Sequence, residues 1–276
     1  MAGCNHPAIN AAFSFGRLNG GMTILPLQQS RAYADALQRL GRPPRWVENE
    51  AGRMLVLARG ITLTSRGPLW RTRDQKQQAK FLRQFSPRIV NADRTLPNVL
   101  RAAGYRQVIT GATVAILDRA CTTHPKWDAA RRRGLDLSLS TEAFSAQHHN
   151  GLLQDERKQQ KRRRYRGLPD GFLQALTPDL EVHIARHDGP VVAWMIFALH
   201  PPTATYLMGL TTEDGRRLGA HHALLQRAKT VLAADVSHID LGCIDTETTP
   251  GLARFKLRSG ARAHRLGGTW LRVPGL

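Results

Sequence analysis

Apolar and polar positions along the chain fall into two stretches that predict the same order of elements. In the first stretch, short apolar runs predict strands, a longer polar run predicts a helix, and Pro and Gly mark the turns. The predicted elements are strands Met54 to Ala58 and Ile61 to Thr64, a turn at Gly67 and Pro68, a helix Asp74 to Phe85, a strand Arg88 to Val90, a helix Pro97 to Ala103 closed by Gly104, and a strand pair Gln107 to Leu117.

The second stretch repeats this order. Its first two strands are joined by the hairpin-type pair Asp188 and Gly189. The predicted elements are strands Leu180 to Ala185, Val191 to Leu199 and Ala204 to Leu210, a long helix Arg216 to Ala234, a strand His238 to Cys243, a helix Pro250 to Leu257 before Gly260, and a last strand Ala263 to Val273. Both stretches end with a strand, a helix, a strand, a Pro-led short helix and a strand.

This shared order indicates a duplicated unit. Pro97 to Arg101 stands in the first stretch where Pro250 to Arg254 stands in the second. We therefore expect an α/β protein of the mixed α+β kind, with two tandem units, each a mostly antiparallel sheet flanked by helices. The predicted divisions are a disordered leader over 1–21, a first unit over 22–121 opened by a strand at Thr23 to Leu27, a basic helical linker over 122–167, and a second unit over 168–276.

Composition narrows the class of protein. The 276 residues are 42% hydrophobic, enough for one large core or two modest ones, and the longest apolar run, Val191 to Leu199, is too short to cross a bilayer as a helix. Three cysteines, none in a CxxC pair, and the lack of a secretory signal predict a soluble cytoplasmic protein without a structural zinc site. The phosphate-binding patterns GxGxxG and GxxxxGKS are absent, which argues against hydride transfer and nucleotide hydrolysis.

The charge indicates an anionic partner. Forty Lys and Arg against 21 Asp and Glu give a net charge of +19. Such a surplus attracts nucleic acid, nucleotide cofactors, anionic lipid intermediates or the inner membrane surface, although for most individual arginines a solvated face is the more common role. The densest segment, from Arg157 to Arg166, includes Arg162, Arg164 and Tyr165. It predicts either a groove for a polyphosphate or an RNA acceptor stem, or a solvated helix face.

Three places carry candidate chemistry. Arg216, Arg217, Gly219 and Ala220 stand at a strand-to-helix junction, where free backbone amides favour a phosphate, although an ordinary helix cap fits as well. Asp240 and Asp245 lie near the end of a strand, where a carboxylate suits amine deprotonation or turn capping, and Asp240 is the weaker functional candidate.

Lys256 stands on the short helix just before a Gly turn. There it would bind a phosphate or offset the charge of a tetrahedral oxyanion, whereas an isolated lysine is usually solvated. The pairs His148–His149 and His221–His222 are adjacent in sequence, so their side chains point in different directions and we expect no metal site.

Several of these segments resemble the FemAB-like branch of the GNAT acyltransferase superfamily. The likeness covers roughly residues 22–276, and its most specific part is the Asp-Leu-Gly-x-Ile-Asp run followed by the Phe-Lys pair. The matching segments are Ala204 to Gly209, Gly219 to Leu225, Ile239 to Asp245, Gly251 to Leu257, Gly267 to Leu271 and, in the first half, Ser65 to Trp70. The resemblance implies two tandem GNAT domains.

The resemblance also implies an activity. Members transfer an acyl or aminoacyl group to an amine, and the best known add amino acids from charged tRNA to peptidoglycan precursors. By that likeness Lys256 would lie near the reacting ester or thioester and Tyr206 would line the channel of the second domain, while Arg216, Arg217, Gly219 and Ala220 would bind the donor.

Trp70 joins Arg162, Arg164 and Tyr165 as a candidate for binding the acceptor or a phosphate. No permanent cofactor is expected, because acyl-CoA or aminoacyl-tRNA would be a donor substrate. Arg216 and Gly219 fit the pyrophosphate loop of GNAT enzymes, but His221 stands where that loop has a small residue.

The expected reaction needs no covalent enzyme intermediate. An amine attacks the donor carbonyl directly, Lys256 and backbone amides stabilise the oxyanion, and the amine proton goes to Asp245 or a water that it holds, to His238 or to the substrate. The alternatives are an acyl-CoA-dependent enzyme acting on a small amine or sugar, a non-catalytic protein that binds RNA or a membrane surface, and a degenerate GNAT pair kept as a scaffold.

Overall fold

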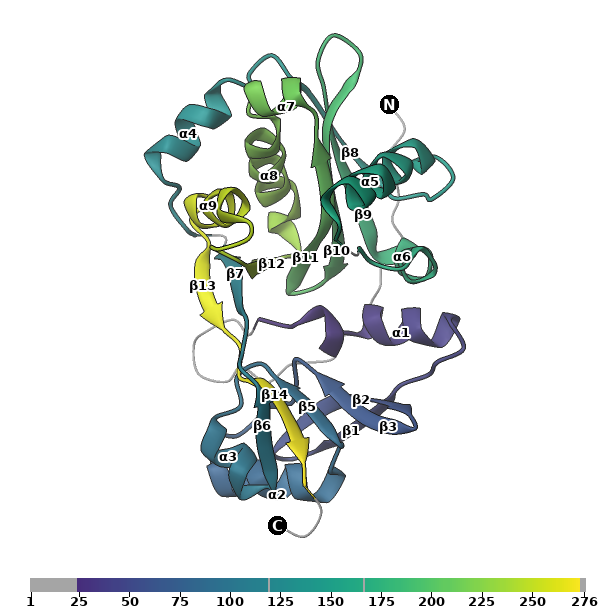
Figure 1. The fold of residues 1–276 in the computed structure, drawn as a ribbon, viewed down its shortest axis with the longest axis vertical. Coiled ribbons are helices and arrows are strands. Elements are labelled where there is room, and N and C mark those ends of the chain that lie inside the picture. Colours follow the sequence, from purple (N-terminus) through teal and green to yellow (C-terminus); the bar gives the residue numbers. More distant parts are fainter. Residues whose placement is uncertain (1–23, 119, 166, 274–276) are drawn as a thin grey trace.

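The computed structural model describes residues 24–118, 120–165 and 167–273, which form two lobes built on seven-stranded sheets (Figure 1). The first sheet has the order β1-β2-β3-β5-β14-β6, with β4 paired to β2, and the second has the order β13-β7-β12-β11-β10-β9-β8. The strands of the first sheet are β1 (Arg45–Asn49), β2 (Gly52–Arg59), β3 (Ile61–Ser65), β4 (Leu69–Trp70), β5 (Ile89–Ala92), β6 (Tyr105–Ile109) and β14 (Gly268–Arg272). Those of the second are β7 (Thr113–Asp118), β8 (Ser138–Ala143), β9 (Leu180–Arg186), β10 (Val191–His200), β11 (Thr203–Thr211), β12 (His238–Ile244) and β13 (Arg262–Arg265).

Helices cover both faces of the second sheet and pack against the first. The helices are α1 (Arg31–Arg39), α2 (Gln75–Phe85), α3 (Pro97–Ala102), α4 (Pro125–Arg132), α5 (Asn150–Arg163), α6 (Asp170–Leu176), α7 (Glu213–Arg217), α8 (Ala220–Val231) and α9 (Pro250–Arg258), with short 3-10 turns at Leu27–Gln29, Thr177–Asp179 and Leu232–Ala234. One core lies between the second sheet and the side of α4 and α8, and another between that sheet and α1, α5 and α6. Because β10 is covered on both faces, its residues form a nearly continuous apolar run.

The two lobes exchange one strand each. β7 follows β6 in the chain but lies in the second sheet, between β12 and β13, while β14 follows β13 but lies in the first sheet, between β5 and β6. The exchange is reciprocal. In the first half, β6 stays in the first sheet and β7 enters the second; in the second half, β13 stays in the second sheet and β14 enters the first. The mixed α/β class and the pair of related units that the sequence predicts are confirmed.

The predicted boundaries of 22–121 and 168–276 do not separate the two sheets. Hydrophobic pattern identifies a strand but not its partner, so it could not assign β7 and β14 to the opposite lobe. The predicted last strand, Ala263 to Val273, is two strands interrupted at Leu266 and Gly267. The predicted linker, 122–167, contains β8, which is one of the two edge strands of the second sheet, as well as α4 and α5.

Two smaller differences concern the predicted elements. The strand expected at Thr23 to Leu27 is wrong over its described part, where residues 24–26 are irregular and a 3-10 turn begins at Leu27. The long helix expected from Arg216 is two helices, α7 and α8, separated at Leu218 and Gly219 because Gly219 is left-handed with a φ of 67°. The predicted leader, 1–21, lies outside the described residues. Within those residues, no helix has the length and apolar character needed to cross a membrane.

Candidate functional site

The second sheet opens between its two central parallel strands. β11 and β12 pair only over Thr203–Thr205 and His238–Asp240, although β11 runs on to Thr211 and β12 to Ile244. β11 also shifts register against β10 beside Phe197, and such an irregularity bends a strand away from its neighbour. The backbones of the two strands therefore separate towards their carboxyl ends, and separating parallel strands commonly admit a ligand there.

The first sheet lacks this opening. Its corresponding parallel pair, β3 and β5, also joins over three residues, but β3 ends at Ser65. Arg66 follows immediately and directs its guanidinium to Asp93, beyond the end of β5, with a contact of 2.9 Å. In the first lobe, the Arg66–Asp93 ion pair therefore lies just beyond the paired ends of β3 and β5. In the second lobe, the corresponding strands β11 and β12 continue past this point and diverge.

Lys256 lies at this opening, on α9, with 6% of its surface exposed. Its Nζ donates a hydrogen bond of 2.7 Å to the backbone oxygen of Cys243, near the end of β12. Gly242, with a φ of 77°, leaves space above the amine, because a Cβ built there would still be 3.8 Å from Nζ. Burial lowers the pKa of Lys256, and the nearby Cys243 and Asp240 only partly offset this.

The duplicated half has no lysine at this position. When Pro97–Arg101 is set against Pro250–Arg254, Lys256 falls opposite Ala103, which is also buried, with 1% of its surface exposed. The fold accepts a small apolar residue there, so the fold itself does not require the lysine. Burying an ammonium group costs free energy, and such groups cluster at functional sites.

Asp245 caps the turn that leads from β12 into α9. Its carboxylate accepts hydrogen bonds from the backbone amides of Glu247 and Thr248, at 2.9 and 2.8 Å, and from the Thr248 hydroxyl. These bonds lower the pKa of Asp245, with the Thr248 hydroxyl as the largest cause. The residue is exposed, and its bonding makes it a weak proton acceptor near neutral pH.

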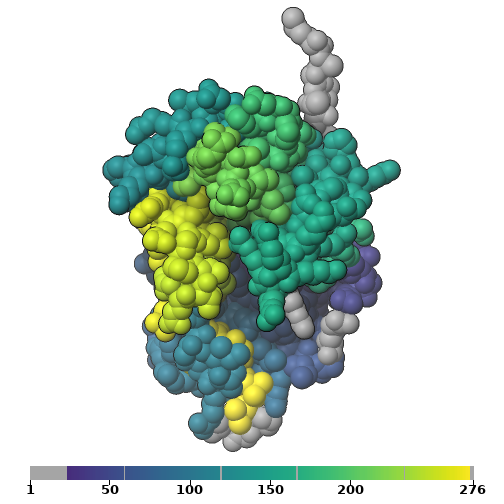
Figure 2. All heavy atoms as spheres, turned by 45° about the horizontal axis from the view of Figure 1, so that its top comes forward, coloured from purple at the N-terminus to yellow at the C-terminus, as the bar shows by residue number. Residues whose placement is uncertain are grey.

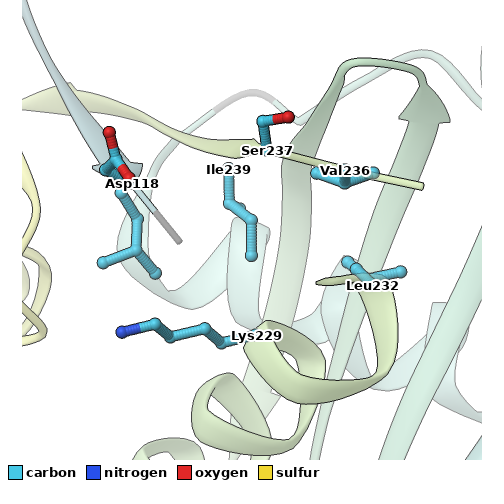
Figure 3. A pocket seen from close by; sticks show the side chains of 7 residues that line it. Asp118, Lys229, Leu232, Val236, Ser237 and Ile239 are labelled. Carbon is cyan, nitrogen blue, oxygen red and sulfur yellow. The ribbon is translucent and has the colours of Figure 1, made fainter. Parts of the chain in front are cut away.

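His238 lies at the opposite end of β12 from Lys256. Cys243 is five positions further along the strand, a distance of about 16 Å. Beside His238, Leu117, Asp118, Lys229, Leu232, Val236, Ser237 and Ile239 enclose a cavity of about 10 Å³ (Figure 3). This cavity holds one water molecule at most, so it is too small for a substrate. His238 does not belong to the opening, because the length of β12 separates it from Lys256.

Tyr206 lies on β11 just beyond the residues that pair with β12, so its backbone is at the opening. Its hydroxyl lies over Gly209, where a Cβ would be only 2.8 Å away. Burial raises the pKa of Tyr206 well above its usual value, and the neighbouring Glu156 and Tyr165 of the α5 region add to this. The hydroxyl therefore stays protonated and can donate a hydrogen bond.

The predicted donor-binding residues lie where α7 ends, with Arg216 and Arg217, and where α8 begins, with Gly219 and Ala220. The side chains of both arginines have partners within the protein. Arg216 donates to the Thr211 oxygen at 3.0 Å, and Arg217 to Asp214 at 3.2 Å. A Cβ on Gly219 would be 2.1 Å from the Ala130 oxygen, so α4 packs directly over this glycine and the adjoining Ala220 begins the helix beneath it. A backbone oxygen thus lies where a phosphate would approach Gly219.

Aromatic side chains fill the space between α4, α8 and α9. Trp127 of α4 packs against His222 and Phe255, with ring centroids 4.4 and 4.9 Å apart. His221, at the expected small-residue position, lies 2.9 Å from the Leu210 oxygen through Nε2. Burial lowers the pKa of His221 to about 4, so the ring is neutral near pH 7 and donates this bond.

The predicted basic segment forms the end of α5, which lies beside the carboxyl end of β11. Arg162, Lys158, Asp155 and Gln159 of α5 and Leu210 and Thr212 of the β11 end line an open hollow of about 280 Å³. Figure 2 shows the surface recessed between α5, in teal, and the yellow C-terminal segment that contains α9. Arg164 ends α5 in a left-handed conformation and is exposed.

Tyr165 and Trp70 have internal roles. The Tyr165 hydroxyl donates to Glu156 at 2.5 Å, and burial together with this carboxylate raises the pKa of Tyr165 to about 12. Trp70 lies in the first lobe, where its Nε1 donates to Thr95 at 3.0 Å and its ring packs on Phe81. Trp70 is therefore not brought together with the residues of the second lobe.

A buried charge network that the sequence interpretation missed joins the lobes beside the opening. Arg66 contacts both Asp93 and Asp240, and His264 contacts Asp93 at 2.8 Å. Burial opposes the charge on Arg66, but the two carboxylates outweigh it and raise its pKa. The signal that could have identified Arg66 was its place in the Ser65 to Trp70 motif, at the end of a strand.

Sequence comparisons return no match: no family model fits the chain, and no curated protein resembles it significantly. Solved structures are similar in fold. The crystal structure of FemX superposes with a TM-score of 0.72, 11% identity, and coverage of 90% of this chain and 92% of that one. The C-terminal domain (DUF2156) of a putative lysylphosphatidylglycerol synthetase from Agrobacterium fabrum has a TM-score of 0.58 at 15% identity, covering 90% and 89%.

L-PGS from Bacillus licheniformis is similar to the same degree, with a TM-score of 0.56, 15% identity, and coverage of 90% of this chain and 94% of that one. At these identities the likeness concerns the fold. The FemAB-like fold that the sequence segments predict is therefore confirmed over nine-tenths of the chain.

Proposed function

We propose that the protein is an acyltransferase that moves an aminoacyl group from aminoacyl-tRNA to an amine acceptor, with Lys256 at the reacting carbonyl. The observation that carries this proposal is the buried Lys256 amine at the carboxyl end of the diverging strands β11 and β12. The similarity in fold to FemX and to the domain of a putative lysylphosphatidylglycerol synthetase supports the proposal. The name of the second protein indicates transfer of an aminoacyl group, and this chain shares its architecture.

Lys256 can stabilise the negative charge that forms during transfer. An ammonium group has three donors, and one of them is used by the Cys243 oxygen. When the acceptor amine attacks, the carbonyl carbon becomes tetrahedral and its oxygen becomes negative, which the remaining two donors would offset. The backbone bond fixes the direction of the side chain, so this donor is oriented before the substrate arrives.

The packing around α8 favours a tRNA donor over acyl-CoA. Acyl-CoA would place its pyrophosphate at the start of α8, where the Ala130 oxygen covers Gly219 and His221 occupies the expected small-residue position. An aminoacyl ester on the end of an RNA needs no such pocket. The exposed basic residues of α5, which include Arg162 and Arg164, provide a surface for phosphates beside the hollow at the β11 end.

Proton transfer in this proposal passes between the substrates. The amine loses a proton as its nitrogen bonds to the carbonyl carbon, and the ribose oxygen gains one as its ester bond breaks, so direct or water-mediated transfer between them balances the step. Tyr206, kept protonated, can donate a hydrogen bond to the carbonyl oxygen or to the ribose oxygen. Asp245 retains its turn-capping role, and an Asp245→Asn variant is expected to keep most of the transfer activity.

The test is transfer of a radiolabelled amino acid from charged tRNA by the purified full chain. Amine acceptors are offered in separate arms, namely amine-bearing peptidoglycan precursors and small polyamines. Phosphatidylglycerol vesicles, which offer hydroxyls and no amine, form the arm in which the proposal expects no transfer. Lys256→Met should reduce transfer by about 100-fold or more, as expected for loss of an oxyanion donor. Lys229→Met is the matched control, because the Lys229 Nζ also donates to a backbone oxygen, that of Cys121 at 2.8 Å, but away from the opening.

Thermal unfolding identifies the donor independently of the acceptor. Charged tRNA should raise the midpoint more than uncharged tRNA, and acetyl-CoA or longer acyl-CoA should not raise it. Stabilisation by acyl-CoA would contradict the tRNA donor and indicate a thioester-dependent acyltransferase. Equal, salt-sensitive stabilisation by any polyanion, with transfer unaffected by Lys256→Met, would contradict catalysis at this site and leave only a basic binding surface.

A further inference from the structure

We propose that Glu142, His148 and His149 form a binding site for a divalent transition-metal ion such as Zn²⁺, on the opposite edge of the second sheet from β13. The three residues come from the end of β8 and from the turn that leads into α5. They are the one group of this kind among the residues that the structure describes. The adjacency of the two histidines had argued against a metal, but both rings reach the same carboxylate.

The distances suit a small tetrahedral ion. Glu142 Oε2 lies 3.4 Å from His149 Nε2 and 3.9 Å from His148 Nε2, and the three ligand atoms all lie within 4.8 Å of one another. Zinc bonds of about 2.0–2.1 Å in a tetrahedron place neighbouring ligand atoms about 3.4 Å apart. Glu142 and His149 already have this separation, and the exposed His148 needs only a small side-chain movement.

His149 is oriented for this role by its surroundings. It is 4% exposed, its ring is stacked on Phe144, and its Nδ1 lies 3.0 Å from the Ser145 oxygen. The Ser145 amide also lies 3.1 Å from Nδ1 and donates to it when Nδ1 is unprotonated. Metal binding selects the other tautomer, in which Nδ1 donates to the Ser145 oxygen and Nε2 keeps a lone pair. His149 Nε2 is buried and has no hydrogen-bond partner among the described residues, so it is a polar atom directed at Glu142 without a ligand of its own.

Glu142 has a matching outer contact. Ser140 donates from its hydroxyl to Glu142 Oε1 at 3.0 Å, which leaves Oε2 free to face the histidines. Ser140 and Glu142 are two residues apart on β8 and therefore share a face of the sheet, the face that also carries Phe144. Both inner ligands are thus held by a second contact, as in established metal sites.

The ligand set selects the metal. Two imidazoles and one carboxylate suit Zn²⁺, Co²⁺ or Ni²⁺, whereas Mg²⁺ and Ca²⁺ prefer oxygen ligands. The site adjoins the amino end of α5, where the helix dipole opposes a cation, so the carboxylate of Glu142 provides the charge that makes binding favourable. A bound ion would tie β8 to the start of α5, the helix that covers β11 next to Tyr206.

The experiment measures Zn²⁺ binding to the tag-free full chain by competition with a chromophoric chelator, with thermal unfolding as the second readout. Wild type should bind one Zn²⁺ per chain, and Zn²⁺ but not Mg²⁺ should raise the unfolding midpoint. Glu142→Gln and His149→Gln should each weaken binding by about 100-fold, and Ser140→Ala, which keeps all three ligands, by about 10-fold. Co²⁺ should give the strong visible absorption of a four-coordinate ion.

Controls separate this site from other ligands and from misfolding. His187→Gln removes a partly exposed histidine near a carboxylate of Asp188, and a Cys4→Ser, His6→Gln double variant removes possible ligands outside the described residues. Both variants should bind Zn²⁺ like wild type. Glu142 is partly exposed, so Glu142→Gln should keep the wild-type circular dichroism even if the buried His149 variant does not. Absence of binding by wild type, or unchanged binding by Glu142→Gln, would overturn the proposal.

Discussion

At the scale of single residues, Arg66 links the lobes through charges that are almost fully removed from water. Its guanidinium is 12% exposed, and its partners Asp93 and Asp240 are 8% and 2% exposed. Arg66→Ala would leave both carboxylates buried without their cation, so we expect a loss of about 3–5 kcal/mol in the free energy of unfolding, measured in urea. Arg71→Ala, which breaks an exposed pair with Glu48, should cost less than about 1 kcal/mol. Equal losses would contradict this account.

His221 gives the stability a pH dependence. Its pKa is about 4 in the folded chain and about 6.5 when unfolded, so the unfolded state binds more protons between these values and stability falls as pH decreases from 6.5 to 4. At pH 5 this residue should cost about 2 kcal/mol relative to pH 7.5. Urea unfolding at both pH values should show a smaller pH effect for His221→Gln than for wild type. His187→Gln, a variant of a partly exposed histidine beside the β9–β10 turn, is the control. If His221→Gln leaves the pH dependence of the free energy of unfolding unchanged, another group causes that dependence.

Only some site residues could be predicted from sequence, because sequence shows residue type and local element but not tertiary partners. Lys256 was identified from its place before a Gly turn, and the structure adds its burial. Asp245 stands where expected, but its bonds to Thr248 depend on turn geometry that spacing does not give. Arg66 and Asp240 meet across 174 positions of sequence, a contact that no local pattern reports.

At the scale of elements, α4 closes the start of α8 by close backbone contact. Gly219 combines a φ of 67° with a Cβ position 2.1 Å from the Ala130 oxygen, so Gly219→Ala should strain the backbone and displace α4. We expect a cost of about 3 kcal/mol or more in urea unfolding. Gly41 has nearly the same φ, 68°, with open space around it, so Gly41→Ala should lose only the backbone contribution of about 1–2 kcal/mol. Equal losses of unfolding free energy for Gly219→Ala and Gly41→Ala would mean that α4 moves away from residue 219 at little cost.

The regular elements were largely predictable, and the exceptions have identifiable causes. α2 begins after Asp74, whose side chain accepts from the backbone amides of Lys76 and Gln77, a cap that the sequence indicates. The sequence predicts a helical linker where β8 lies, because Ser138–Ala143 is short and polar. Its pairing with β9 provides the stability that its composition does not. Tertiary pairing decided what local preference left open.

At the scale of the whole molecule, the reciprocal strands make each lobe dependent on chain from the other half. Trp270 is fully buried in the core of the first lobe beside Leu82 and Tyr105, although it lies six positions before the last residue. Trp270→Ala should therefore cost about 3–5 kcal/mol, and hydrogen exchange should show lost protection first in peptides covering β5 and β6, between which β14 lies.

The matched control is Trp127→Ala, since Trp127 is as deeply buried but packs in the second lobe against His222 and Phe255. It should expose α8 and α9 and leave β5 and β6 protected. If the lobes were instead built from contiguous sequence, Trp270→Ala would affect the neighbouring β13 and α9 first, and the exchange pattern would contradict the strand exchange. Because β7 and β14 each join one sheet to the other, global urea unfolding of wild type should follow one transition whether it is monitored at the first or the second lobe.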